Sequence, residues 1–305
     1  MRLSGSLKMD TNYCHFQCDL PHGVINLTPV TQQADEQFAR WIAQGRHAGM
    51  AYMEKYPDVR HDPRLLLDGA QSLIVVAFPY FTTEPMELPF ALYARGRDYH
   101  EVVRERLTAL AAQLPGESRV CVDTAPLRER YWAARVGLGF IGLNNQLILP
   151  GSVGSYAFLG SIITTAVVQP TAPLTQRREC YRCGRCVAAC PAHALHADGS
   201  GVDATRCLSY LTIEHRGEFP PGTDLHGKIY GCDVCQQVCP HNSAVIPTDI
   251  AEFHPSEALC RLTLHDIEAM TPEQFSALFR HSAVRRTKLS GLQRNAQKLS
   301  EQKLN

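Results

Sequence analysis

The sequence predicts an α+β protein, in which an N-terminal α/β lobe precedes a compact cysteine-rich domain and a short, basic, helical C-terminal segment. Three observations support this prediction. Strand and helix patterns are mixed in the first part of the chain, eight of the 12 cysteines lie between residues 180 and 239, and basic residues gather after residue 280. We place the boundaries at 1–170, 171–250 and 251–305. With 305 residues and 45% hydrophobic content, the chain can bury a sizeable core and form two or three lobes.

Hydrophobic periodicity predicts the elements of the N-terminal lobe. Residues 34–44 have helical spacing, residues 72–81 form a buried apolar strand, and residues 99–114 form an amphipathic helix. Pro115 and Gly116 end that helix. Residues 169–179 are polar, contain proline and read as a linker to the cysteine-rich domain.

A second strand and helix surround Asp123. Residues 120–122 read as a short strand that delivers Asp123 to the start of a helix. Pro126 suits the first turn of that helix and Gly137 suits the position after its end. The glycines of residues 137–142 match the spacing of a dinucleotide-binding loop, but that loop needs a strand before it and a helix after it. Here a helical pattern comes first, so we exclude nicotinamide binding.

The two cysteine blocks have the spacing of cubane iron–sulfur ligands. The first reads C-x2-C-x2-C-x3-C-P, and the second reads C-x2-C-x3-C-P with one more cysteine displaced upstream. In two-cluster bacterial ferredoxins, three close cysteines bind one [4Fe–4S] cluster and the last cysteine of the run binds the other. The expected ligands are Cys180, Cys183, Cys186 and Cys239 for one cluster, and Cys190, Cys207, Cys232 and Cys235 for the other.

Zinc and disulfides are the competing readings of these cysteines. Zinc sites usually separate two cysteine pairs by a longer spacer, whereas three cysteines here crowd into seven residues. The same spacing disfavours a disulfide framework. The four other cysteines read as small apolar residues or free thiols, and a metal site that joins Cys14 and Cys18 to nearby histidines is disfavoured.

Composition indicates an intracellular protein. The 30 basic and 30 acidic side chains cancel, and residues 1–6 lack an apolar signal region. The longest apolar stretches, near 73–78 and 157–168, are too short to span a membrane. We therefore expect a cytoplasmic protein, where thiolates stay reduced and available to iron.

The charge is unevenly distributed. Residues 280–305 carry seven basic side chains and one acidic one, a local charge of +6. Such a segment suits a polyanion such as a nucleic acid, and it also suits a solvated terminal helix. Composition alone leaves both readings open.

Several motifs together resemble one known family. Residues 123–126 (Asp-Thr-Ala-Pro), 137–142 (Gly-Leu-Gly-Phe-Ile-Gly), 154–160 (Gly-Ser-Tyr-Ala-Phe-Leu-Gly) and 230–240 accompany the cysteine blocks. With the Gly-x-x-Arg-Asn-Ala pattern at 291–296, this set resembles epoxyqueuosine reductases. The resemblance implies a cobalamin-dependent enzyme with two [4Fe–4S] clusters, which reduces epoxyqueuosine to queuosine at the wobble position of tRNA.

The resemblance also implies site residues and partners. Asp123 would donate a proton to the departing epoxide oxygen. The corrin contacts would be Arg60, Asp123, Asn144, Leu147, Leu159, Ile163, Leu208, Asp233 and Val234. The tRNA contacts would be His215, Arg285, Arg286, Lys288 and Arg294. Many relatives carry lysine where this chain has Leu143. The partners would be tRNA with epoxyqueuosine in its anticodon loop and a low-potential electron donor, and we expect a monomer that binds no membrane.

Two roles stay open for Asp123. As a proton donor it must be protonated near neutral pH, so burial, which raises its pKa, must outweigh a nearby helix N-terminus, which lowers it. Alternatively, its carboxylate only caps a helix that begins at Thr124.

Three functions remain for the whole chain. The first is the tRNA-modifying reductase. The second is an enzyme similar to corrinoid reductive dehalogenases, which would need an apolar small-molecule pocket and no basic tail. The third is a ferredoxin-type electron carrier, which would not need the roughly 180 residues that precede the clusters.

Overall fold

The structure is a computed structural model that describes residues 5–10, 13–171 and 179–304. Its strands are β1 (Gly5–Asp10), β2 (Tyr13–Cys18), β3 (His22–Asn26), β4 (Ser72–Pro79), β5 (Ser118–Cys121), β6 (Phe140–Ile141), β7 (Leu147–Ile148) and β8 (Ala157–Thr164). Its α-helices are α1 (Gln32–Ala43), α2 (Pro57–His61), α3 (Tyr99–Ala111), α4 (Glu129–Arg135), α5 (Arg185–Ala189), α6 (Leu208–Ile213), α7 (Val234–Gln237), α8 (Glu257–Cys260), α9 (Leu264–Glu268), α10 (Pro272–Phe279) and α11 (Lys288–Leu304). Short 3-10 helices are η1 (Ala51–Met53), η2 (Pro63–Leu66), η3 (Leu92–Ala94), η4 (Pro240–Asn242), η5 (Ala251–Phe253) and η6 (Ala283–Thr287).

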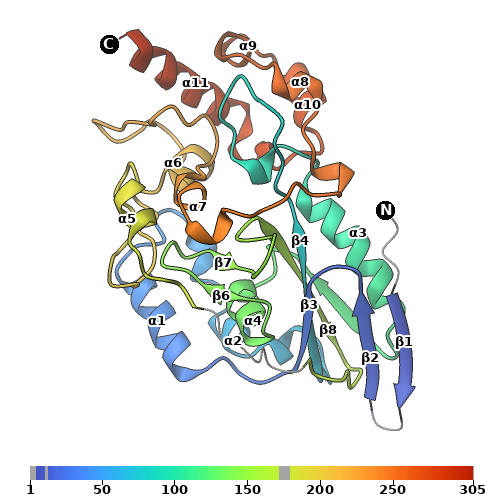
Figure 1. The fold of residues 1–305 in the computed structure, drawn as a ribbon. Coiled ribbons are helices and arrows are strands. Elements are labelled where there is room, and N and C mark those ends of the chain that lie inside the picture. The colour runs from blue at the N-terminus through green and yellow to red at the C-terminus, as the bar shows by residue number, and fades with distance from the viewer. Residues whose placement is uncertain (1–4, 11–12, 172–178, 305) are drawn as a thin grey trace.

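A four-stranded antiparallel sheet forms the centre of the N-terminal half (Figure 1). Its order is β3-β4-β8-β5, so the longest strands, β4 and β8, lie in the middle. The strand β4 is buried from residue 72 to residue 78 because both faces of the sheet are covered. A β1-β2 hairpin lies beside this sheet, and β6 pairs with β7 in a separate small hairpin.

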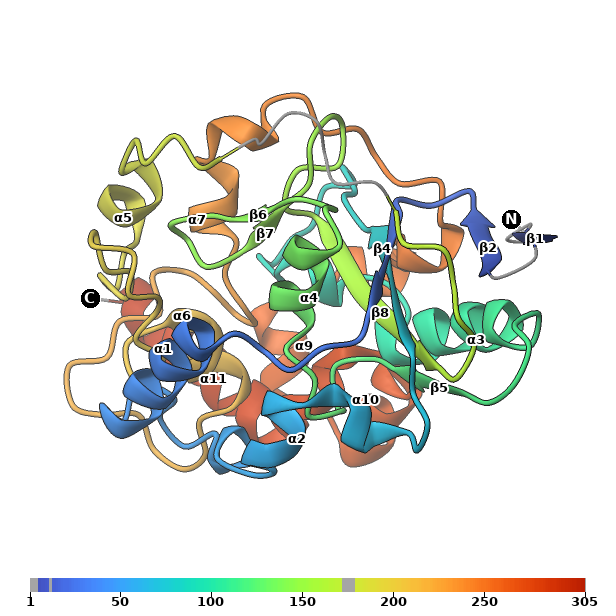
Figure 2. The ribbon, with the colours of Figure 1, turned by 90° about the horizontal axis from the view of Figure 1, so that it is seen from below.

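Helices α3 and α4 cover opposite faces of the sheet (Figure 2). Successive side chains of a strand point to opposite faces. In β4, Ile74 and Val76 therefore share one core with Leu107 of α3, while Val75 shares the other core with Trp132 of α4. This arrangement fixes the start of α3 and the loop between β5 and α4 at the same end of the lobe.

The sequence predicts several of these elements within a few residues. The helices at 34–44 and 99–114 and the strand at 72–81 correspond to α1, α3 and β4. The helix expected at residue 124 begins only at Glu129, and Pro126 lies before it. Gly137 follows the end of α4 with φ of 83°, as its position predicts. Residues 172–178 of the expected linker lie outside the described residues.

The cysteine-rich segment packs beside α1 (Figure 1). The indole Nε1 of Trp41 donates to the carbonyl of Val202 at 2.7 Å. The C-terminal helices share a third core with the segment near Phe90, and the members of that core include Leu88, Phe90, Ala94, Ile229, Tyr230, Ile267, Phe279, Leu292 and Leu299. The three expected chain segments are therefore joined by common cores.

Within the described ranges, no helix is both long and apolar enough to cross a membrane.

Candidate active site

The eight cysteines of the two blocks form two electrostatically coupled sets. Burial is the main cause that raises the pKa of the Cys239 thiol, and nearby Cys180 and Cys183 raise it further. Burial likewise raises the pKa of Cys235, with further increases from Cys207, Cys232 and Cys190. The last cysteine of each block is thus coupled to sulfurs of the other block, and the resulting sets are those expected for two clusters.

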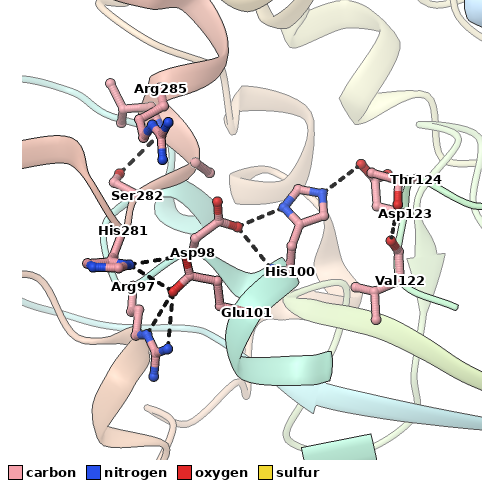
Figure 3. A network of polar contacts seen from close by, with 12 residues as sticks. Arg97, Asp98, His100, Glu101, Val122, Asp123, Thr124, His281, Ser282 and Arg285 are labelled. Carbon is pink, nitrogen blue, oxygen red and sulfur yellow. Dashed lines mark hydrogen bonds and ion pairs between the residues drawn. The ribbon is translucent and has the colours of Figure 1, made fainter. Parts of the chain in front are cut away.

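Asp123 lies at the centre of a tight turn after β5 (Figure 3). The N–H of Thr124 donates to the carbonyl of Val122, and φ of Asp123 is 52°. A three-residue turn with positive φ at its centre is rare and strained, and such strain concentrates at functional sites. The side chain of Asp123 is 56% exposed, so its carboxyl is accessible to a ligand.

The structure contradicts the alternative in which Asp123 caps a helix. Helix α4 begins at Glu129, its N-cap residue is Arg128, and that N-cap makes no side-chain capping hydrogen bond. The backbone N–H of Asp123 instead donates to Oε1 of Glu129 at 2.8 Å. The turn therefore ties Asp123 to α4 through the backbone and leaves its carboxyl available for other contacts.

His100 is the closest charged partner of Asp123. Its Nε2 lies 3.0 Å from Oδ2 of Asp123, and its Nδ1 lies 2.7 Å from Oδ1 of Asp98 (Figure 3). Burial raises the pKa of Asp123, but hydrogen bonds from His100 and Tyr99 lower it more, so the pKa lies below its ordinary value. The expectation that burial would outweigh the effects that lower the pKa of Asp123 is therefore wrong.

The nearby proton is held by other groups. Burial lowers the pKa of His100, but its hydrogen bonds to Asp123 and Asp98 outweigh that effect and raise it to about 9. Burial and the Asp123 carboxylate raise the pKa of Glu129 to about 8. At neutral pH the site thus combines a charged His100, a charged Asp123 and a neutral Glu129.

Arg286 lies beside the same site. Its Nε and Nη2 donate to the two carboxylate oxygens of Glu214 at 2.8 and 2.9 Å, and its guanidinium lies 5.5 Å from the ring centroid of Tyr52. Arg286 also lowers the pKa of Asp123. Tyr52 is 42% exposed. Segments far apart in sequence therefore place an aromatic ring and a cation near the accessible Asp123 carboxyl.

The residues expected to contact a corrin ring fall into two groups. Five have almost no accessible surface, and these are Asn144 (3%), Leu147 (6%), Ile163 (0%), Leu208 (2%) and Asp233 (6%). With so little surface, they can shape a binding surface mainly from behind. Arg60, Leu159 and Val234 are partly exposed. Their apolar surface and guanidinium suit a large flat ligand that carries polar side groups.

Contacts between elements support one shared surface for part of this set. Asn144 Nδ2 donates to the carbonyl of Cys235 at 3.2 Å and so joins the β6-β7 hairpin to the second cysteine block. Leu147, Leu159 and Ile163 contribute to the core on the α4 face of the sheet. The guanidinium of Arg60 is hydrogen-bonded to the carbonyls of Tyr52 and Lys55.

The basic residues of the C-terminal segment differ in their surroundings. Arg285 and Lys288 are exposed, as a contact with tRNA requires. Arg294 instead donates to the carbonyls of Leu211, His215 and Gly217, and its guanidinium lies 4.0 Å from the ring centroid of Phe219. Arg294 therefore has a structural role, and its contact with tRNA stays a prediction.

His215 and Leu143, two further positions noted in the sequence, both contact neighbouring side chains. His215 is hydrogen-bonded through Nε2 to the carbonyl of Glu218 at 2.7 Å and stacks on Phe219. Leu143, where many relatives carry lysine, is buried in a small core with Cys186 and Leu195. The side chain at 143 therefore packs against the cysteine region.

Sequence reasoning missed four residues of this site. They are Tyr52, His100, Glu129 and Glu214, all of which lie close to Asp123 or Arg286. For His100, the available signal was its position directly after an Asp-Tyr pair at the start of a helix, because an N-cap aspartate can orient a first-turn side chain. Only the tertiary structure brings the other three to the site.

Family models match two parts of the chain. The model described as "Epoxyqueuosine reductase QueG, DUF1730" matches residues 60–124, a range that includes both His100 and Asp123. The model described as "4Fe-4S double cluster binding domain" matches residues 179–242, a range that includes all eight cysteines of the two blocks. The two matches therefore cover the accessible carboxyl and the coupled sulfur sets.

Curated proteins and solved structures agree with these models. An epoxyqueuosine reductase from Leadbetterella byssophila is 38% identical over 283 residues, which cover 89% of this chain and 91% of that protein. One from a Synechocystis strain is 38% identical over 291 residues, which cover 90% and 99%. A crystal structure of epoxyqueuosine reductase with an epoxyqueuosine-modified tRNA-Tyr stem loop has a TM-score of 0.81 at 27% identity, and the match covers 91% of this chain and 76% of that one. The chain belongs to the epoxyqueuosine reductase family, whose members are tRNA-modifying oxidoreductases that use cobalamin and two [4Fe–4S] clusters.

Proposed function

We propose that this chain removes the epoxide oxygen of epoxyqueuosine at the wobble position of tRNA and leaves queuosine. The observation that carries this proposal is the accessible carboxyl of Asp123, held in a strained turn within the matched reductase segment. A simple electron carrier needs no acid beside a cationic and aromatic surface. The relative solved with a modified tRNA stem loop supports tRNA as the substrate class.

The two coupled cysteine sets fit two [4Fe–4S] clusters. Cys180, Cys183, Cys186 and Cys239 would hold one cluster, and Cys190, Cys207, Cys232 and Cys235 the other. Each cubane needs one thiolate per iron, and each set supplies four. Because the last cysteine of each block binds the opposite cluster, the two clusters share one compact frame. This frame suits electrons that arrive singly from a low-potential donor.

Arg60, Leu159 and Val234 would contact cobalamin, while Asn144, Leu147, Ile163, Leu208 and Asp233 would support that surface from behind. When bound, cobalamin would supply a low-valent metal that uses single electrons to cleave a carbon–oxygen bond. The role of the chain is to hold the substrate, exclude water and move protons. Asp123 would deliver a proton to the epoxide oxygen, and Tyr52 and Arg286 would hold the modified nucleoside near that carboxyl.

The C-terminal segment would hold the rest of the RNA. Arg285 and Lys288 are exposed and lie next to Arg286 in sequence, so a strand that places its base near Asp123 would pass them. Phosphate contacts of this kind position a substrate without reading its sequence. His215 lies on the same side, since its carbonyl accepts from Arg294 of α11. We further propose that the protein acts as a cytoplasmic monomer.

The direct test uses the protein reconstituted anaerobically with iron, sulfide and cobalamin. A stem loop that contains epoxyqueuosine is incubated with the reduced enzyme, and the nucleosides are analysed by mass spectrometry. We expect loss of one oxygen, to give queuosine, only when cobalamin is present. A fully loaded and reduced enzyme that leaves the nucleoside unchanged would contradict the proposed function.

A further inference from the structure

His100 is held between two carboxylates. Its backbone N–H donates to Oδ1 of Asp98 at 3.0 Å, and its Nδ1 lies 2.7 Å from the same oxygen (Figure 3). Asp98 is the N-cap of α3, so the start of the helix fixes the ring. Tyr99 stacks on the imidazole with centroids 4.1 Å apart. The remaining nitrogen, Nε2, faces Oδ2 of Asp123 at 3.0 Å.

This geometry requires a proton on both ring nitrogens. A carboxylate only accepts hydrogen bonds, and imidazole donates from both nitrogens only when it is positively charged. Burial raises the pKa of Asp98 and of Asp123, but hydrogen bonds from His100 outweigh it, with smaller decreases from Arg285 at Asp98 and Arg286 at Asp123, so both carboxylates are ionised at neutral pH. Glu129 is neutral at pH 7 because burial and Asp123 raise its pKa to about 8. His100 and Glu129 therefore both carry a titratable proton at pH 7, but only His100 directs one at the Asp123 carboxylate, since the hydrogen bond of Glu129 is with the Asp123 backbone N–H.

The proposed reaction needs protons that Asp123 alone does not hold. When an epoxide becomes an alkene, the oxygen leaves as water, so it gains two electrons and two protons. The electrons come from the reduced redox groups of the family. Because the pKa of Asp123 is lowered, its carboxylate carries no proton at neutral pH. A neighbouring group must supply each proton that Asp123 delivers.

We propose that His100 is a positioning residue that stores this proton and passes it from Nε2 to the Asp123 carboxyl, which gives it to the epoxide oxygen as the carbon–oxygen bond breaks. The inference rests on the proposed function. After transfer, His100 is neutral and keeps its Nδ1 hydrogen on Asp98, so Nε2 remains an acceptor that faces the site. The side chain of His100 is 28% exposed, so solvent can reload it for the second proton.

The pairing of a histidine with an orienting aspartate follows general acid–base logic. The orienting carboxylate fixes the tautomer and stabilises the charged ring. Asp98 occupies this role here, and its own backbone N–H donates to the carbonyl of His281 at 2.7 Å. The segment that carries Arg285 and Arg286 thereby anchors the residue that orients His100. A structural role at the start of α3 would need the Asp98 cap but not a charged ring.

The test combines a titration and a rate profile. In the first experiment, histidine-labelled holoenzyme is titrated by NMR, with His100→Gln used to assign the signal. We expect His100 to titrate near pH 9 and to shift to lower pH in Asp123→Asn and in Asp98→Asn. A signal that titrates near pH 6.5, the ordinary value for histidine, or that ignores Asp123→Asn, would overturn the inference.

The second experiment is single-turnover conversion of a modified stem loop by fully reduced enzyme at several pH values. His100→Gln should be slower by about 100-fold at pH 7.5, the lower range for a positioned acid–base group, and its rate should keep falling as pH rises. His100→Gly should recover rate with added imidazole. His281→Gln is the matched control, because the His281 side chain is 61% exposed and only its carbonyl contacts Asp98.

The possible failures are distinguishable. A wild-type enzyme that leaves epoxyqueuosine unchanged would remove the proposed function, and the proton store with it, whatever the titration shows. An active wild-type enzyme with an unchanged pH profile in His100→Gln would remove only the present inference. Loss of activity in His100→Gly without rescue by imidazole, together with a lowered unfolding temperature, would reduce His100 to a structural residue.

Discussion

The Nε and Nη2 atoms of Arg286 donate to the two carboxylate oxygens of Glu214 at 2.8 and 2.9 Å. This pair fixes the guanidinium plane over Tyr52, near the accessible carboxyl of Asp123. The side chain of Arg286 is still 53% exposed, so a ligand can reach it. A basic residue near the Asp123 carboxyl is thus held by an acid from the end of α6.

We expect Arg286→Lys to reduce kcat/KM for the modified stem loop by about tenfold or more, although charge is kept. Lysine cannot form the two parallel bonds or stack on a ring, and a charge-assisted hydrogen bond contributes roughly 1.5–3 kcal/mol. The matched control is Arg285→Lys, since a phosphate contact tolerates lysine. Equal activity of Arg286→Lys and the wild-type enzyme in single-turnover assays would show that Arg286 acts only as a charge.

Lys288 and Arg294 provide a contrasting pair for RNA binding. Lys288→Gln should weaken binding of the stem loop and reduce its salt slope by about 1, as removal of one phosphate contact does. Arg294→Gln should lower the unfolding temperature and leave the salt slope unchanged, because Arg294 already donates to three backbone carbonyls. Binding is measured by fluorescence anisotropy at several salt concentrations. If Arg294→Gln reduces the salt slope and Lys288→Gln does not, Arg294 contacts tRNA.

Iron content tests the two cysteine sets. Anaerobic wild-type protein should contain about eight irons, and Cys239→Ala should contain about four, since one cubane loses a ligand. Cys183→Ala combined with Cys239→Ala should lose no more iron than Cys239→Ala alone, because both residues belong to one set. Cys235→Ala combined with Cys239→Ala should lose nearly all of the iron, because the two residues belong to different sets.

Cys260→Ala is the control for this series and should keep about eight irons. Cys260 lies at the end of α8, outside both blocks. A double variant of Cys183 and Cys239 that loses both clusters would refute the crossed arrangement.

Asp123→Asn should keep the fold, the clusters and bound cobalamin. Asparagine tolerates the positive φ of the turn, and its side chain caps no helix here. Single-turnover conversion should fall by roughly 10²–10⁴-fold, the usual contribution of a positioned acid. Asp224→Asn, in an exposed loop, serves as the control. Conversion by Asp123→Asn at the wild-type rate would exclude Asp123 as the proton donor.

Glu129 should make the stability of the protein depend on pH. Its pKa is raised from 4.5 to about 8 on folding, so the stability linked to its protonation is present below pH 4.5 and is lost as pH rises through 8. Glu129→Gln keeps an acceptor for the Asp123 N–H and removes the titration. The variant should therefore melt at about the wild-type temperature near pH 4.5 and a few degrees higher at pH 8.5. If the melting temperatures of the variant and the wild-type protein differ by the same amount at every pH in this range, Glu129 is ionised in the native protein.

Local sequence patterns were sufficient to predict several elements and a domain for two iron–sulfur clusters. The strand β4 and the helices α1 and α3 follow from hydrophobic spacing, because burial of one face imposes a period within each segment. The cysteine blocks follow from spacing as well, since a cubane needs ligands at fixed short separations. The start of α4 was predicted five residues too early, because Thr124–Arg128 continue a turn anchored to Glu129 rather than a helix.

The charge state of the site was decided by the tertiary structure alone. Whether Asp123 is ionised depends on His100, Glu129 and Arg286, which come from different segments. Electrostatic effects depend on distances in space, and no local pattern records those distances. The different surroundings of Lys288 and Arg294 also depend on the tertiary structure. Both belong to one basic helix, but packing of that helix against residues 211–219 turns Arg294 inward and leaves Lys288 exposed.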